Sequence, residues 1–280
     1  MVERVHQLPG IVISECAQQM DDFYTVTQST DGWRSEFPGW ATVVVSPDGH
    51  HVRALAHPRC SPATLAHLTC DIVLPAAVAD TGMTAFHASA VAYPDGAVMF
   101  LGPSGRGKSF LSVALALRGV AFLADDHVTV SWKGQQPIAH LATPAARLHP
   151  QSISALWPGL GNPPVRSSPV AQYTDKRRVW AADSGFVTAE ASPLRAIVVL
   201  GDEQYHGPVH MQRISPAQAV SALAQHTMTN YPHNQSGQTQ LLDDVARMAD
   251  ITAVWSLDYQ RNMTAVAEVD HQLRLILRVS

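Results

Sequence analysis

The sequence predicts a mixed α/β fold preceded by a small β-rich segment. Two observations carry this prediction. Residues 86–280 combine short apolar runs with amphipathic stretches, and they contain the succession strand, glycine-rich loop, helix, strand, which places a phosphate site at the carboxyl ends of strands. Residues 1–85 instead show short alternating runs separated by turn residues. We therefore expect a β-rich N-terminal segment, 1–85, and one domain spanning 86–280.

The N-terminal segment contains strand signals followed by one helix signal. Three stretches are predicted as strands, at 23–27, 40–45 and 51–55. The last two flank the turn residues 46–49 and form a predicted hairpin. Residues 61–79 are predicted as a helix, with Ser61 as the N-cap and Pro62 in the first turn.

The second part begins with the strand, loop and helix succession. Strands are predicted at 86–92, 97–101, 120–124, 194–200 and 253–257, and helices at 108–118, 215–225, 240–249 and 263–276. Gly119 ends the first of these helices as a C-terminal cap would. Residues 134–183 are rich in proline, glycine, serine and polar residues, so we expect loops with little regular structure there, near an active site.

Composition and charge exclude several classes of partner. The net charge is −4, and no long run of Lys or Arg occurs, which argues against nucleic acid and acidic membranes as partners. Cys16, Cys60 and Cys70 form neither a disulfide framework nor a zinc pattern. No stretch approaches the roughly 20 apolar residues of a membrane helix, and residues 1–10 lack the pattern of a signal peptide. We therefore expect a cytoplasmic protein with free thiols.

The strongest motif is Gly102-x-x-x-x-Gly107-Lys108-Ser109, between an apolar strand and a helix. Glycines let backbone N–H groups turn inward around a phosphate, and the helix offers its positive end to the same anion. Lys108 would reach the β- and γ-phosphates, and Ser109 would reach magnesium. The sequence therefore predicts binding of ATP with Mg²⁺. The residues expected at the nucleotide are Gly102, Ser104, Gly105, Arg106, Gly107, Lys108, Ser109 and Phe110.

Two carboxylates and one histidine accompany this loop. Asp125 and Asp126 end the strand expected beside the loop's own strand, and neighbouring strand residues point to opposite faces. One would hold magnesium, and the other would accept a proton from an attacking hydroxyl. The alternative is a solvated pair of acids in a turn. His87 is expected on the strand before the loop, either as a functional group or as an ordinary core histidine.

Basic residues farther along the chain are candidates for a substrate clamp. Lys176 and Arg177 belong to the densest basic cluster and would bind a γ-phosphate or a carboxylate, as would Arg147. The alternative is a solvated run of charge. A polar aromatic patch, either a substrate contact or an interhelical loop, comprises His226, Asn230, Tyr231, His233 and Asn234.

The succession of these motifs resembles a known family. His87, the loop 102–109, Arg118-Gly119 and Ala124-Asp125-Asp126 follow one another within about 45 residues, as in the catalytic core of the HPr kinase/phosphorylase family. Most phosphate-loop enzymes place their acidic strand much farther on. A weaker similarity continues through 146–148, Lys176 and 193–197, and is shared with the shorter HPr-kinase-like proteins, including kinases found with lasso-peptide biosynthesis.

This resemblance implies a fold like the nucleotide-binding domain of phosphoenolpyruvate carboxykinase, and transfer of phosphate from ATP to a serine hydroxyl. It implies that Lys108 and Ser109 bind phosphate and magnesium, that Asp125 is the base, that Asp126 assists the metal and that His87 orients the acidic pair. Residues 1–85 do not match the separate N-terminal domain of full-length HPr kinases. The later glycine-arginine-asparagine signature is missing too, which points away from HPr as acceptor and from phosphorolysis.

The leading hypothesis is therefore an ATP- and Mg²⁺-dependent kinase of a serine in a peptide or small protein, including a lasso-type precursor with a C-terminal serine. A kinase of a small hydroxylated metabolite and a non-catalytic ATP-sensing regulator are the alternatives. The sequence leaves open the acceptor, the choice between ATP and GTP, and assembly into a homo-oligomer.

Overall fold

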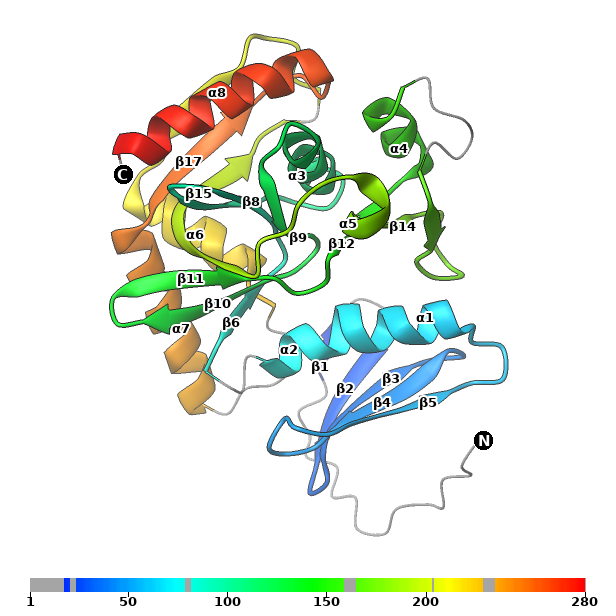
Figure 1. The fold of residues 1–280 in the computed structure, drawn as a ribbon. Coiled ribbons are helices and arrows are strands. Elements are labelled where there is room, and N and C mark those ends of the chain that lie inside the picture. The colour runs from blue at the N-terminus through cyan, green and yellow to red at the C-terminus, as the bar shows by residue number, and fades with distance from the viewer. Residues whose placement is uncertain are drawn as a thin grey trace.

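The computed structural model describes residues 18–20, 24–78, 82–158, 165–202, 204–228 and 235–279 of the 280-residue chain. These residues form three β-sheets and the helices that pack against them (Figure 1). The mixed α/β class predicted from the sequence is confirmed.

The first sheet is an antiparallel meander of five strands in chain order. Its strands are β1 (Gln18–Met20), β2 (Tyr24–Ser29), β3 (Gly32–Phe37), β4 (Ala41–Val45) and β5 (Val52–Ala56). The predicted hairpin is β4 and β5, and burial alternates along β4, with Val43 and Val45 on the inner face. The sequence did not predict β3, because serine and charged residues interrupt its apolar positions.

One continuous helical run packs on this sheet. It comprises α1 (Pro62–Ala66), a π-helical segment η1 (His67–Val73) and α2 (Leu74–Val78). The predicted cap is confirmed, since the Ser61 hydroxyl accepts from the Thr64 backbone N–H at 3.2 Å. Leu68 and Val73 join the core of the sheet, while Asp71, also in η1, is a buried acid. Figure 1 shows this run lying between the five-stranded sheet and the rest of the molecule.

The second sheet forms the body of the molecule. Its main order is β6 (Thr84–Phe86), β10 (Val128–Lys133), β11 (Gln136–His140), β15 (Ala191–Leu200), β8 (Gly96–Leu101), β7 (Ser89–Tyr93) and β9 (Ala121–Ala124), with β17 (Ala253–Asp258) beside β15 and β16 (His210–Arg213) beside β17. The strands β8, β15 and β17 are mutually parallel. The single strand expected at 86–92 was wrong: the chain leaves β6 at His87 and begins β7 at Ser89, because these two strands pair with different partners.

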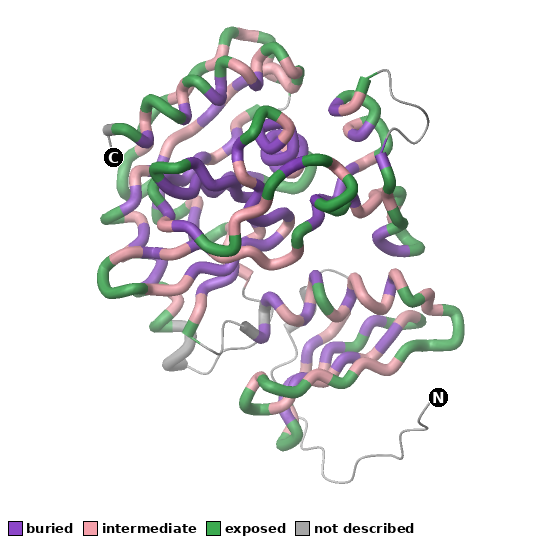
Figure 2. The backbone as a smooth tube through the Cα atoms, viewed as in Figure 1, coloured by how far each residue is buried: buried purple, intermediate pink, exposed green. Residues whose placement is uncertain are grey.

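Helices cover both faces of this sheet. Along β8, Val98 and Phe100 face a core shared with α3 (Lys108–Leu117) and α8 (Met263–Val279). Met99 and Leu101 face a core shared with α6 (Pro216–His226) and α7 (Gln235–Ile251). Because both faces of β8 are covered, the strand is apolar throughout. The tube in Figure 2 is accordingly coloured as buried at the centre of the sheet. The four helices were all predicted.

The region 134–183 corrects the sequence prediction. Loops were expected there, but besides β11 it contains β12 (Ala145–Leu148), α4 (Pro150–Leu156), β13 (Ser167–Pro169), β14 (Arg177–Trp180) and α5 (Ala181–Ser184). A third sheet has the order β12-β14-β13. These strands have only three or four residues each, and β12 pairs with β14 about 30 positions farther along the chain, so no local periodicity marks them.

No helix among the described residues has the length and apolar character needed to cross a membrane. Cys60 and Cys70 are free thiols, as expected, and Cys16 lies outside the described residues.

The hydrophobic cores follow the two parts of the chain. The buried residues of the first sheet's cluster lie between positions 26 and 77, and those of the second sheet's two clusters all lie at or after Phe86. The domain boundary at residue 85 stays a prediction.

Candidate nucleotide site

The glycine-rich loop joins the end of β8 to the start of α3. Gly102 and Gly107 adopt φ values of +145° and +84°, in the region that favours glycine. Gly107 is the N-cap of α3, so the first N–H groups of this helix begin directly beyond the loop. The loop therefore has the backbone form and the helix end that bind a phosphate.

Lys108 is buried against this loop. Its Nζ donates to the carbonyl oxygens of Gly102 at 2.6 Å and Pro103 at 3.2 Å. Burial lowers the pKa of Lys108 to about 8; Asp125 opposes this shift and Lys176 adds to it. The amine is a cation at neutral pH and is held where the loop would receive phosphate.

Three strand ends bring the predicted residues together. The sequence placed the acidic strand beside β8, and this was wrong: β7 lies between β8 and β9. Since both are antiparallel to β7, they run parallel to each other and end at the same edge of the sheet. His87 immediately precedes β7, which starts at that edge. The phosphate loop, His87 and the acidic pair consequently share one edge.

The two carboxylates occupy different environments. Asp125 is only 2% exposed, and its Oδ2 accepts from the backbone N–H of Arg147 at 2.7 Å. Its buried Oδ1 has no hydrogen-bond partner among the described residues. Asp126 has a φ of +69°, and its partly exposed carboxylate lies 2.6 Å from Nη2 of Arg147. A positive φ is energetically costly for an aspartate, so this conformation of the turn depends on contacts with the surrounding structure.

His87 is a neutral imidazole beside this pair. Burial lowers its pKa to about 4, and the cation of Lys108 contributes in the same direction. Its Nδ1 lies 3.9 Å from Oδ1 of Asp126, which is adjacent but beyond hydrogen-bond range. Its backbone N–H donates to the carbonyl of His226 at 2.7 Å, so the end of α6 fixes its position. The other members of the polar patch, at 230–234, lie outside the described residues.

A cavity of about 560 Å³ lies at this edge. Its lining includes Ser104, Gly105, Gly107, Lys108, Ser109 and Phe110 of the loop and α3. It also includes the predicted residues His87, Asp126, Arg147 and Lys176.

Four predicted residues lie elsewhere. Gly102 and Asp125 are buried and do not line the cavity. Arg106 donates from Nη1 to Asp202 at 3.1 Å. Arg177 donates to the hydroxyl and carbonyl of Ser167, both at 2.7 Å, and thereby joins β14 to β13. The basic residue of this cluster that faces the cavity is Lys176.

Sequence reasoning missed Arg261 and His149, which also line the cavity. Arg261 donates from Nη1 to the Gly105 carbonyl at 2.6 Å. It follows β17, and the carboxyl end of this strand meets the loop's edge because β8, β15 and β17 are parallel. The position of Arg261 just after a predicted strand was the available signal. His149, whose Nδ1 lies 2.7 Å from Asp175, belongs to the region expected to be loops.

The residues present fit a magnesium ion that is shared with a nucleotide. No group of three or more His, Cys, Asp or Glu in the described part of the chain is placed to hold a metal ion. However, Mg²⁺ in such sites needs only one or two protein oxygens besides phosphate and water. Ser109 and Asp126 line the same cavity, and Asp125 has an unpartnered carboxylate oxygen. The donors are all oxygens, as this ion prefers.

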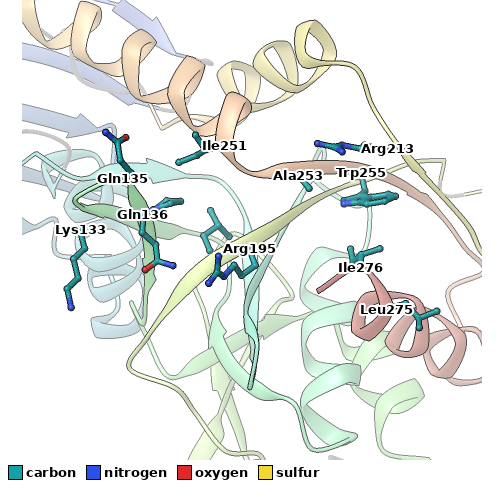
Figure 3. Close-up of a pocket in the computed structure, with 12 residues that line it drawn as sticks. Lys133, Gln135, Gln136, Arg195, Arg213, Ile251, Ala253, Trp255, Leu275 and Ile276 are labelled. Carbon is teal, nitrogen blue, oxygen red and sulfur yellow. The ribbon is translucent and has the colours of Figure 1, made fainter. Parts of the chain in front are cut away.

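A larger cavity, of about 790 Å³, lies away from the loop (Figure 3). It is lined by the cations Lys133, Arg195 and Arg213 and by apolar side chains including Trp255. The described residues that line it include no carboxylate, imidazole or hydroxyl, and thus no group able to accept a proton from a substrate. Despite its size, it is a poorer candidate for the reactive site than the smaller cavity.

Neither the models of known protein families nor the curated proteins match this chain. Among solved structures, the chain is similar to the Hpr(Ser) kinase/phosphatase from Coxiella burnetii, at 15% sequence identity and a TM-score of 0.34, covering 68% of this chain and 97% of that chain. This likeness is distant, and at this score no conclusion about activity, ligand or substrate rests on it.

Proposed function

We propose that this protein is an ATP- and Mg²⁺-dependent kinase. The observation that carries the proposal is the convergence, at one sheet edge, of the phosphate loop with Lys108, the neutral His87 and the acidic pair. A phosphate-binding loop alone would be compatible with any nucleotide-binding protein and would not indicate a kinase. The buried carboxylate beside it adds a group that can take a proton from an acceptor.

In this proposal the loop and the start of α3 bind the β- and γ-phosphates, with Lys108 and Arg261 as the cations. Ser109 and Asp126 would hold magnesium, which neutralises charge on the phosphates. The acceptor hydroxyl oxygen bonds to the γ-phosphorus as the bond from that phosphorus to the leaving ADP oxygen breaks. The hydroxyl proton passes to Oδ1 of Asp125. His87, being neutral, positions the acidic turn and adds no competing charge.

Asp125 is covered in this structure, and Lys108 is folded onto the loop's own carbonyls. Phosphate would offer Lys108 a stronger, charged partner than a carbonyl. We therefore include in the proposal a movement of Lys108 onto the nucleotide that opens the way to Asp125. The buried state of Asp125 is also the observation that favours the alternative, a regulator that binds ATP without transferring phosphate.

The acceptor we propose is a serine hydroxyl of a peptide or small protein, including a lasso-type precursor ending in serine. The motif resemblance described from the sequence is the support for this acceptor. Lys176 lines the cavity and would suit the carboxylate of such a C-terminal residue.

Intact-mass spectrometry of candidate peptides after incubation with ATP and magnesium tests this function. Wild type, Asp125→Asn and Asp126→Asn are compared, together with nucleotide binding by each. We expect wild type to add one phosphate. Asp125→Asn should retain nucleotide affinity but lose at least about a hundredfold in turnover, whereas Asp126→Asn should need more magnesium.

Transfer to small hydroxylated metabolites but to no peptide would mean that the acceptor is a metabolite hydroxyl and not a peptide serine. Tight nucleotide binding with no transfer to any acceptor would favour the regulator. A wild type that binds no nucleotide would refute the proposed function altogether.

A further inference from the structure

A buried charge connects the N-terminal segment to the nucleotide site. Asp71, in the π-helical segment η1, is 3% exposed. Its Oδ2 lies 2.8 Å from Nδ1 of His67 and 3.1 Å from Nη1 of Arg147, and Nη2 of Arg178 donates to it. Burial alone would raise the pKa of Asp71, but the His67 hydrogen bond and the two arginines outweigh it, so the pKa is lowered. Asp71 is therefore an anion at neutral pH.

The two arginines need this anion. Arg147 and Arg178 face each other across the antiparallel pair β12 and β14. Like charges opposite one another destabilise a sheet, and Arg147 is only 6% exposed, so water does not screen it. Asp71 contacts both guanidinium groups and compensates for their repulsion.

Arg147 carries the connection onward to the acidic turn. Its Nη2 donates to the backbone carbonyl of Asp125 at 3.2 Å and lies 2.6 Å from Oδ2 of Asp126. Its backbone N–H binds Oδ2 of Asp125. The left-handed backbone at Asp126 is thus held by an arginine whose other nitrogen is held by Asp71. π-Helical segments often occur at functional sites, and here η1 places a carboxylate against this arginine.

We propose that the N-terminal segment completes the nucleotide site, with Asp71 as a positioning residue that holds Arg147 and, through it, the acidic turn Asp125–Asp126. This inference rests on the proposed function for its effect on turnover, but the mechanical link does not depend on it. Without the charge of Asp71, Arg147 loses a contact that fixes its guanidinium group. The acidic turn that Arg147 contacts is then held less firmly, and so is the carboxylate that would hold magnesium.

The test compares wild type with Asp71→Asn and with Glu36→Gln. Glu36 is an exposed acid of the same segment that pairs with Arg34 at 2.7 Å, so it is a matched loss of charge away from Arg147. Hydrogen exchange of peptides spanning 124–127 and the magnesium dependence of nucleotide affinity are measured for each. Asp71→Asn should speed exchange and raise the magnesium requirement about tenfold, with kcat falling more than KM for ATP rises. Glu36→Gln should match wild type.

Asp71→Asn removes an anion that Arg147 and Arg178 share, and the variant can fail to fold for that reason. The variant Asp71→Asn with Arg178→Gln removes one charge of each sign and keeps the balance. It should show the same faster exchange at 124–127. Unchanged exchange and magnesium dependence in either folded variant, or equal effects from Glu36→Gln, would overturn the inference. A wild type without nucleotide binding would refute the proposed function only, since the exchange comparison still decides the link.

Discussion

Arg147 joins Asp71 to the adjacent pair Asp125 and Asp126, which lies more than 50 positions farther along the chain. Its guanidinium contacts Asp71 and Asp126, and its backbone N–H binds the carboxylate of Asp125. A guanidinium presents donors in a rigid fork, and burial shifts its pKa into the physiological range less readily than that of a lysine amine. The sequence offered Arg147 only as a minor candidate for a substrate clamp. Its geometry adds a role in holding the acidic turn.

At the scale of single residues, the pKa of Lys108 predicts how nucleotide affinity depends on pH. Its pKa, lowered to about 8 by burial, means that the amine is charged below this pH and neutral above it. Because the proposed function has this cation bind phosphate, affinity for ATP should be highest near neutrality and should fall as the pH rises through about 8.

Titration with a fluorescent ATP analogue between pH about 7 and about 9.5 checks this prediction. His87, with a pKa of about 4, stays neutral across this range and does not interfere. Lys108→Ala should bind weakly with little pH dependence. If its affinity falls with pH as steeply as that of wild type, another group is responsible.

At the scale of elements, the join between the glycine-rich loop and α3 depends on one backbone conformation. Gly107 has a φ of +84°, and a Cβ there would lie 3.2 Å from Nε of Arg261. Gly107→Ala should therefore cost about 1–2 kcal/mol of stability through backbone strain. By displacing Arg261 it should also weaken nucleotide binding about tenfold.

Gly134→Ala is the matched control for this prediction. Gly134 has a φ of +62° in the β10–β11 turn, and a Cβ there would have no neighbour within 4 Å. Chemical denaturation should show a similar loss of stability in both variants, while nucleotide titration should show a loss of affinity only in Gly107→Ala. Equal nucleotide affinity in the two variants would contradict the role given to this join.

Elements with strong local periodicity were predicted, whereas several short strands with weak periodicity, including those of the β10–β11 hairpin, were not. The strand β8, the helix α3 and the helices α6, α7 and α8 carry their pattern in consecutive residues. The strands β12 and β14 do not, because they pair across some 30 residues and bury arginines as well as apolar groups. The strand order, with β7 between β8 and β9, is likewise not encoded locally.

At the scale of the whole molecule, polar contacts join the N-terminal segment to the body. Besides Asp71, the Ser61 backbone N–H donates to Oε1 of Gln172 at 2.7 Å, and Gln172 donates to the Thr64 hydroxyl at 2.9 Å. Because a buried acid is shared between the two parts, the stability of the chain should depend on pH through this contact.

The direction of this pH dependence follows from the lowered pKa of Asp71. Its ordinary value is 3.8, and the folded value lies below it. The stabilisation is therefore fully present above 3.8 and is lost as the pH falls through the folded value. At neutral pH, Asp71→Asn should lower the free energy of unfolding by ~3 kcal/mol, as for a broken buried ion pair.

Urea unfolding at several pH values measures this difference. The difference in unfolding free energy between wild type and Asp71→Asn should be constant from neutral pH to about 4 and should shrink below that. Glu36→Gln, at an exposed pair, should change the free energy of unfolding by less than about 1 kcal/mol at any of these values. A difference for Asp71→Asn that persists unchanged at low pH would mean that packing, and not charge, is responsible.

The sequence by itself determined the glycine-rich loop with its strand and helix, and the acidic pair that follows the next strand, because these features are encoded in consecutive residues with a local conformational preference. Only the tertiary structure decided that β7 separates β8 from β9, that Arg261 and Arg147 line the candidate site, and that Asp71 contacts Arg147. These are contacts between residues about 20 to 160 positions apart. They depend on strand order and on the balance of buried charges, and neither leaves a periodic signal in the chain.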